Sequence, residues 1–196
     1  NADRDLASVG MLVRFPLIVV VGSQHPAKSF KELVAWIKAQ PTEVNYASPG
    51  AGTPHHLATE LLLRRLGLKA SHVPYRGAAP ALQDVAGGQL PFMLVESAGG
   101  MPLITGGKLR ALAVGTAQRM KTLPEVPTLQ EQGLKDFEAF AWQGLSVPAG
   151  APAAHIQRLN QALRAAQDST FVKARFQALG VEAVSGTPQQ MQQFAQ

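Results

Sequence analysis

The chain has 196 residues, enough to bury the core of one domain or of two small ones. Hydrophobic residues make up 46% of it and charged residues 16%, a balance that excludes an intrinsically disordered chain. The net charge is +5, but only Arg64 and Arg65 are adjacent, so we expect no nucleic-acid surface, and the absence of cysteine excludes disulfides and thiolate chemistry.

An apolar strand and a capped helix open the predicted fold. Residues 15–21 form a continuous run rich in β-branched side chains, which is typical of a strand buried on both faces. The run is too short to span a membrane, and no signal peptide is visible before it. Ser29 and Glu32 have the spacing of a capping box, so we expect a helix that starts at Ser29 and ends at Pro41.

Strand-like and helix-like segments then alternate regularly up to residue 114. Strands joined by helical connections are typical of an α/β fold, so we expect a mainly parallel sheet flanked by helices. The predicted strands are 44–48, 71–73, 90–95 and 109–114, and the predicted helices are 53–66, 79–86 and a short one that ends near Gly106.

Proline and glycine become frequent after these segments. Residues 115–136 contain Pro124, Pro127 and Gly133 and predict only short helices. Residues 137–147 predict an extended segment. Three helices are expected after it: an amphipathic helix with Ile156, Leu159 and Leu163 on one face, a second that runs to Gly180, and a terminal one from Thr187-Pro188 that is cut off at Gln196.

The segment 46–56 carries the clearest binding motif. A strand ends at Ser48, and Gly50 and Gly52 follow in a tight loop. Thr53 then caps a helix whose first residue is proline. Such a loop directs backbone N–H groups and the positive end of a helix dipole at one spot, which suits a carboxylate or a phosphate. A well-capped turn without a ligand has the same pattern, and the glycine spacing matches neither a P-loop nor a dinucleotide fingerprint.

No catalytic signature stands out. His55 and His56 are adjacent, which is not a metal-ligand spacing. Ser97 lacks the first glycine of a nucleophile elbow. No two carboxylates are visibly paired for glycosidase chemistry. We therefore expect no enzyme, no metal site and no cofactor.

Several short motifs follow one another along nearly the whole chain. They are PAKS (26–29), YASPGAGTPHHLATEL (46–61), VPYRGAAPA (73–81), GGQ (87–89), GKLRALAV (107–114), LPEVPT (123–128), WQG (142–144) and VPAGAP (147–152). Each motif is weak alone, but in this order they resemble the Bug family of solute receptors, also called tripartite tricarboxylate transporter receptors.

This resemblance implies a type II periplasmic binding fold, in which two α/β lobes close on a ligand. Family members carry a further first-lobe segment before the position of Asn1, with a glycine-rich loop that helps to hold the ligand. We therefore expect an N-terminally truncated chain, whose exposed strand edges favour a dimer. The expected parts are a nearly complete second lobe at 14–141, a partial first lobe at 1–13 and 142–196, and crossover strands at 15–16 and 140–143.

The resemblance also implies reversible binding of a small carboxylate in the periplasm and its delivery to the permease subunits of a tripartite tricarboxylate-type transporter. Many relatives carry an aspartate where this chain has Val95, and its loss disfavours an amino-acid ligand unless Glu96 replaces it. The ligand residues carried over are the loop residues Ser48, Gly50, Gly52 and Thr53, the adjacent His56, Tyr75 and Arg76 from a family turn, and Glu96.

Two other functions stay open. An effector-binding domain of a transcription regulator has a similar two-lobed fold, but it needs an upstream helix-turn-helix segment, and the sequence shows none. An enzyme on an α/β scaffold would turn over carboxylate esters or phosphates, whereas a receptor would only bind its ligand.

Overall fold

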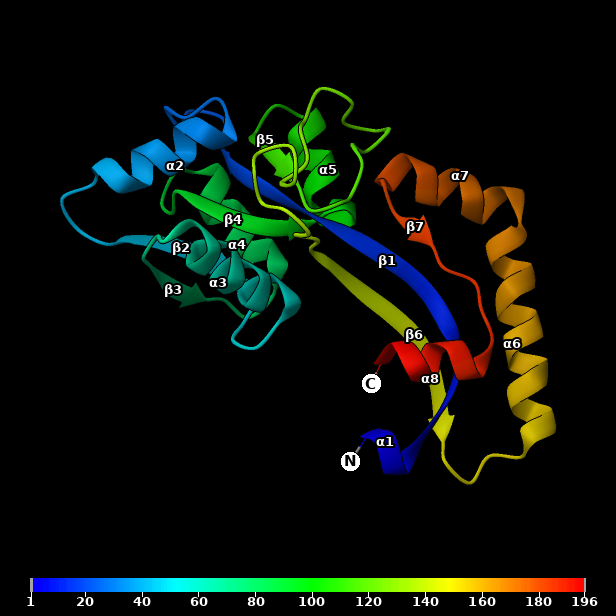
Figure 1. The fold of residues 1–196 in the computed structure, drawn as a ribbon. Helices are drawn as coiled ribbons and strands as arrows, with labels where there is room; N and C mark the ends of the chain where they lie inside the picture. Colours follow the sequence, from blue (N-terminus) through cyan, green and yellow to red (C-terminus); the bar gives the residue numbers. More distant parts are fainter. Residues whose placement is uncertain (1, 196) are drawn as a thin grey trace. The chain divides into compact units, whose positions relative to one another are not determined.

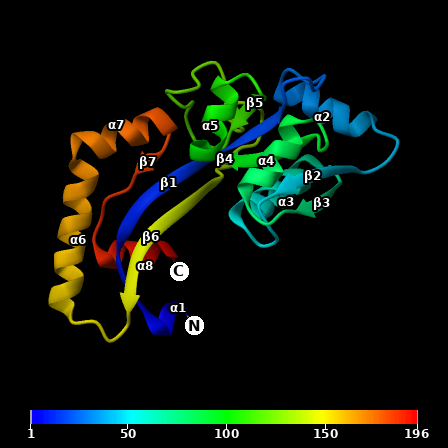
Figure 2. The same cartoon turned by 180° about the vertical axis from the view of Figure 1, so that it is seen from behind.

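The computed structural model describes residues 2–195, which divide into two compact units. Unit 1 comprises the residues up to Phe15 together with those from Trp142 onward, and unit 2 is Pro16–Ala141. Strand β1 (Leu6–Gly22) begins in unit 1 and ends in unit 2 (Figures 1 and 2). Among residues 2–195, every helix is too short or too polar to cross a bilayer.

Strand β1 is longer than the sequence predicted. The apolar run predicted a strand at 15–21, whereas β1 already begins at Leu6. Its first part buries Val9, Met11 and Val13, the alternate positions of a strand with one face against a core. A continuous apolar run therefore revealed only the part of β1 that is buried on both faces.

Unit 2 is built on a sheet with the strand order β3-β2-β4-β1-β5. Strand β2 pairs in parallel with β3 and β4, whereas β1 runs antiparallel to β4 and β5. The predicted α/β fold is confirmed, with β1 reversed relative to the other strands. Burial on both faces predicts a central strand but not its direction, so the sequence could not show this reversal. The strands are β2 (Val44–Ser48), β3 (Ala70–Pro74), β4 (Phe92–Glu96) and β5 (Leu109–Val114).

Helices cover both faces of this sheet (Figures 1 and 2). Leu17 and Val19 of β1 belong to one buried cluster, with residues of α2 and α3. Ile18 and Val20, which alternate with them, belong to a second cluster, with residues of α4 and α5. Each face of the sheet thus has a core of its own. The helices are α2 (Phe30–Ala39), α3 (Pro54–Leu66), α4 (Ala78–Ala86) and α5 (Ser97–Thr105).

The predicted N-cap of α2 and C-cap of α3 are present, although Glu32 bonds to the N–H of Lys28 rather than to that of Ser29. The Ser29 hydroxyl accepts the Glu32 N–H at 3.2 Å, and the Glu32 carboxylate accepts the Lys28 N–H at 2.7 Å. Gly67 ends α3 in the left-handed region, with φ 63°.

The segment between β5 and β6 corrects another expectation. Short helices were predicted within 115–136, but this stretch forms turns and no helix. Thr128 makes an isolated parallel bridge to Val114, and the Val114 N–H donates to the Pro127 carbonyl at 2.9 Å. The backbone groups of this stretch therefore bond to the edge of β5, and Pro124 and Pro127 interrupt any helical ladder.

Unit 1 contains the first part of β1 and the C-terminal elements. Strand β6 pairs with β1, and so does β7, which is antiparallel to it. Helix α8 ends at Ala195, so the prediction for Gln196 lies outside the described residues. The elements are α1 (Ala2–Asp5), β6 (Phe140–Pro148), whose first two residues belong to unit 2, α6 (Ala153–Asp168), α7 (Thr170–Leu179), β7 (Glu182–Ala183) and α8 (Pro188–Ala195).

Helix α6 buries two amides on the same side as part of the predicted apolar stripe, of which Ile156 and Leu163 are half-buried. Leu159 is 39% exposed, whereas Asn160 and Gln167 are buried. The Asn160 amide donates to the carbonyls of Val9 and Gly186, both at 2.8 Å. The Gln167 amide likewise donates to the carbonyls of Met11 and Leu12 in β1 and of Val184, just after β7, at 2.7 to 3.3 Å. Hydrogen bonds to these backbone carbonyls therefore add to apolar contacts in setting which side of α6 faces inward.

Candidate anion-binding site

The loop from Ser48 to Thr53 joins β2 to α3 in unit 2. Ser48 is fully buried at the end of β2, and Thr53 is the N-cap of α3. The Thr53 hydroxyl accepts the His56 N–H at 3.4 Å and donates to the Gly50 carbonyl at 2.7 Å. Gly52 has φ 75°, a left-handed conformation that favours glycine. The capped βα turn predicted from the sequence is thus present.

The loop divides its backbone donors into two groups. The Gly50 N–H donates to the Ser48 hydroxyl at 3.1 Å, and the Gly52 N–H donates to Nδ1 of His56 at 3.0 Å. In contrast, the N–H groups of Ala51 and His55 have no hydrogen-bond acceptor among residues 2–195. Ala51 is exposed, and His55 lies in the first turn of α3. Two unengaged donors at a helix N-terminus are an arrangement that binds anions.

The turn 75–77 braces the loop through its backbone. The Tyr75 N–H donates to the Ser48 carbonyl, and the Gly77 N–H donates to the Pro49 carbonyl, both at 2.9 Å. The Tyr75 hydroxyl donates to Asp84, which raises the Tyr75 pKa. Arg76 is the middle residue of this turn, and its side chain is exposed. Tyr75 and Arg76 are therefore close to the loop in the fold, with the tyrosine hydroxyl already engaged.

The side chains of Glu96 and His55 lie next to each other at the same edge of the sheet. Strands β2 and β4 are parallel, so Glu96 at the end of β4 and the loop after β2 share one edge. Nε2 of the buried His55 lies 3.3 Å from Oε2 of Glu96. The hydrogen-bonding interaction with His55 lowers the Glu96 pKa, although partial burial opposes this. Glu96 is therefore an ionised carboxylate that already has a partner.

A row of stacked rings lies behind the loop. The His56 ring stacks on the His72 ring with centroids 3.9 Å apart, and His72 stacks on Tyr46 at 5.1 Å. Nε2 of His72 is 2.5 Å from the Ser48 hydroxyl. The Tyr46 hydroxyl donates to Glu60, whose carboxylate lies 4.0 Å from Nε2 of His56.

Burial and charge shift the pKa values of this row. Desolvation lowers the His72 pKa, the neighbouring His56 lowers it further, and Glu60 raises it in part. Burial raises the Tyr46 pKa, and its bond to Glu60 adds to the effect. The His72 imidazole and the Tyr46 phenol are therefore both favoured in their neutral forms.

The sequence predicted the loop but gave no role to His72, nor to Tyr46 and Glu60, although the last two lie within the motif at 46–61. Tyr46 and His72 are directly opposite one another on β2 and β3, which only the register of the two strands reveals. The motif did include His56, and the structure places it against the loop as expected. Within residues 2–195, no group of three or more acidic, histidine or cysteine side chains is placed to hold a metal ion.

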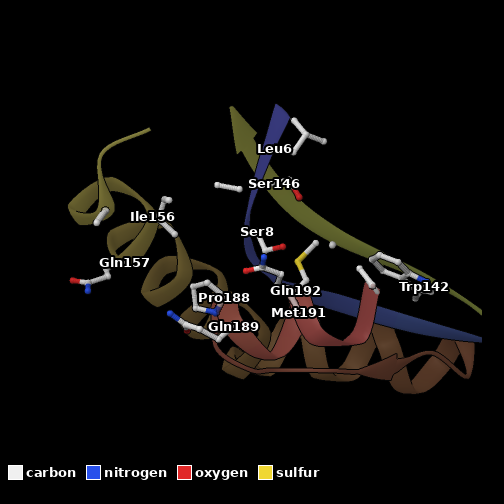
Figure 3. Close-up of a pocket in the computed structure, with 14 residues that line it drawn as sticks. Leu6, Ser8, Trp142, Ser146, Ile156, Gln157, Pro188, Gln189, Met191 and Gln192 are labelled. Carbon is white, nitrogen blue, oxygen red and sulfur yellow. The ribbon is translucent and has the colours of Figure 1, made fainter. Parts of the chain in front are cut away.

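A separate groove of about 540 Å³ lies within unit 1 (Figure 3). Apolar side chains such as Leu6, Trp142, Ile156 and Met191 line it, together with the amides of several glutamines. None of the lining residues is charged. A small carboxylate needs concentrated donors or positive charge, so the loop of unit 2 suits it better than this groove.

Comparisons with known proteins agree with the motifs. The family model described as "Tripartite tricarboxylate transporter family receptor" matches residues 1–196. The chain is 36% identical to the protein of the TAR-I ttuE-ttuC' intergenic region of Agrobacterium vitis, over 92% of this chain and 52% of that protein. It is 34% identical to protein BugT of Bordetella pertussis, over 97% of this chain and 58% of BugT.

Solved structures show the same fold. Rpa4515 of R. palustris with adipate matches with a TM-score of 0.94 and 30% identity, over 99% of this chain and 65% of that one. MatC from Rhodopseudomonas palustris with bound malate matches with a TM-score of 0.90 and 30% identity, over 98% of this chain and 66% of that one. The chain thus spans between 52% and 66% of the length of these four proteins. It has a periplasmic binding protein fold and belongs to the tripartite tricarboxylate transporter receptor family.

Proposed function

We propose that the full-length protein containing this chain is a periplasmic receptor that binds a small carboxylate and delivers it to a tripartite tricarboxylate-type membrane transporter. Membership of the receptor family supports the transport role. Two related structures hold adipate and malate, which supports a carboxylate as the ligand. The observation that carries the proposal is the pair of unengaged N–H groups at Ala51 and His55, at the N-terminus of α3.

The carboxylate would accept hydrogen bonds from these two N–H groups. Ser48, Gly50, Gly52, Thr53 and His56 give the loop its shape, because their hydrogen bonds are made within it. The positive charge of Arg76, next to the loop, would attract an anion.

We also propose that the ligand lacks an ammonium group. An ammonium would need an acceptor with free negative charge, and the carboxylate expected to take that role is Glu96, at the end of β4. Oε2 of this carboxylate already faces Nε2 of His55 at 3.3 Å, so an ammonium would have to share it. Calorimetry should therefore show tighter binding of succinate, malate or adipate than of aspartate or glutamate. Tighter binding of the amino acids would contradict this part of the proposal.

An aspartate substitution at a helix cap tests the location of the site. Asp is a good N-cap, so Thr53→Asp keeps α3 capped but puts a negative charge where the anion would lie. We expect the carboxylate affinity of the full-length protein to fall by at least about tenfold, because like charges repel at the helix N-terminus. Calorimetry measures the affinity, and thermal unfolding confirms the fold.

Ser29→Asp is the matched control. Ser29 caps α2 in the same way, through the Glu32 N–H, but α2 follows β1 and not the 48–53 loop. This variant should bind carboxylates as the wild type does. An equal loss of affinity in both variants, or none in Thr53→Asp, would remove the loop as the binding site.

A further inference from the structure

We infer that His72, on strand β3, is a positioning residue for the 48–53 loop, which it holds in the conformation that leaves the Ala51 and His55 N–H groups free for the ligand. The inference rests on the proposed function, because it concerns the same site. His72 belongs to none of the loop elements and reaches the loop only through the pairing of β3 with β2.

The first contact of His72 fixes the Ser48 hydroxyl. This hydroxyl lies between three groups: the Gly50 N–H, which donates to it, the Gly50 carbonyl at 3.0 Å, and Nε2 of His72 at 2.5 Å. A hydroxyl has one proton, so it donates either to Gly50 or to His72, and His72 takes the complementary role. In both cases, the bond to His72 holds the oxygen where it accepts the Gly50 N–H.

The second contact of His72 limits the position of His56. The two rings are nearly parallel, with an interplanar angle of 13° and centroids 3.9 Å apart. Nδ1 of His56 accepts the Gly52 N–H at 3.0 Å. One side chain on β3 thus supports the acceptors of both glycine N–H groups. The Gly50 and Gly52 N–H groups therefore bond within the loop, and the Ala51 and His55 N–H groups stay available to a ligand.

The surroundings of His72 hold its ring in place. Tyr46 stacks on it with an interplanar angle of 23°, and the Tyr46 hydroxyl is tied to Glu60. Glu60 also lies 4.0 Å from Nε2 of His56. A series of contacts therefore links Ser48 to His72, His72 to His56, and His56 to Gly52. A purely structural explanation, in which the rings only pack the edge of the sheet, makes a different prediction for variants that keep the ring.

The test compares His72→Phe with His72→Gln in the full-length protein. Phenylalanine keeps a stacked ring but cannot bond to Ser48, whereas the glutamine amide can reach the place of Nε2. Hydrogen exchange of the Gly50 amide in the ligand-free protein is the first readout. We expect about tenfold faster exchange in His72→Phe, the effect of losing one hydrogen bond, and recovery in His72→Gln. If the exchange rate of the Gly50 amide is unchanged in His72→Phe, or does not return toward the wild-type rate in His72→Gln, the inference is overturned.

Affinity for adipate or malate is the second readout. We expect His72→Phe to bind the carboxylate about tenfold more weakly, since the loop loses a single hydrogen bond. The same substitution should have no further effect in a Ser48→Ala background, because phenylalanine keeps the stack on His56 and removes only the bond to that hydroxyl. Additive losses in the double variant would overturn the inference. His25→Phe, which removes another half-buried imidazole of unit 2, should leave the affinity unchanged.

The two readouts separate this inference from the proposed function. If Gly50 exchange responds as expected and no carboxylate binds the wild type, the proposed function fails and the positioning role of His72 stands. If carboxylates bind and His72→Phe changes neither exchange nor affinity, the inference fails alone. Should His72→Phe not fold, His72→Asn replaces it, because the shorter amide matches Nδ1 and cannot reach Ser48. Slow exchange of Gly50 in His72→Asn would again overturn the inference.

Discussion

The two units are stabilised by different means. In unit 2, helices cover both faces of a sheet, and its fully buried side chains include Tyr46, Phe92 and Phe137. In unit 1, α7 buries no residue, and α6 buries only Asn160 and Gln167, whose amides bond to backbone carbonyls. In unit 2, apolar side chains from helices therefore cover both faces of the sheet, whereas in unit 1 the amide hydrogen bonds of α6 supplement the buried side chains of Val9, Met11 and Val13. Substitutions in each unit test this difference, and a pH series tests the buried histidines of unit 2.

The largest effect is expected from the core of unit 2. Phe92 is 1% exposed and stacks on Tyr46, with centroids 5.8 Å apart. Phe92→Ala should lower the free energy of unfolding by about 3–5 kcal/mol, because it removes buried surface and leaves a cavity. Phe171→Ala in unit 1 is the control: its ring is 81% exposed, and the cost should stay within about 0.5 kcal/mol. Urea unfolding measures the free energy of unfolding of both variants. Equal losses in the two variants would contradict a stabilising role for the buried core of unit 2.

The buried amide of Asn160 should give a smaller effect. Asn160→Ala leaves the Val9 and Gly186 carbonyls without their donor, and we expect a loss of about 1–3 kcal/mol. Gln161→Ala, at the exposed neighbouring position, should be close to neutral. If urea unfolding finds Asn160→Ala as mild as Gln161→Ala, hydrogen bonds from α6 do not hold unit 1 together.

The smallest effect is a dependence of stability on pH that originates in unit 2. Burial lowers the pKa values of His25 and His72, and Arg110 and His56 respectively lower them further. The folded state therefore binds fewer protons than the unfolded state below about pH 6.5, the ordinary imidazole pKa. Stability should be complete above that pH and fall as the pH drops from there toward the lowered values.

His72→Gln should make this decline less steep, because it removes one of the two contributing imidazoles. His155→Gln, on the exposed surface of α6, is the control and should leave the decline as it is. Urea unfolding at a series of pH values measures the slope. A decline that is steeper at low pH in His72→Gln than in the wild type would contradict the assignment.

Local signals predicted much of the fold. The Thr53 cap and Gly67 located α3 to within one residue, and β2 and β5 have the predicted bounds. These elements are specified by residues near one another in the sequence. The reversed direction of β1 was not predictable, because an apolar run has the same composition in either direction. Asn160 and Gln167 were missed because polar residues on a helix ordinarily face water, and only the carbonyls of β1 explain their burial.

The candidate site also has features that local sequence predicts and contacts that only the tertiary structure reveals. The loop and its cap could be predicted because glycine, threonine and proline act on their own backbone. The contact between Ser48 and His72 could not, because the two residues are 24 positions apart and meet only through the register of β2 and β3. The pairing of His55 with Glu96 likewise needs the placement of α3 against β4.

We expect a small carboxylate to bind at the Ala51 and His55 N–H groups. The most direct test is a titration of the ¹⁵N-labelled full-length protein with succinate, malate and adipate, followed through the amide resonances of these two residues. Binding at the loop predicts saturable shifts of both resonances with the same affinity that calorimetry measures. Binding that leaves both resonances unmoved, or no binding of any of the three carboxylates, would contradict carboxylate binding at this loop.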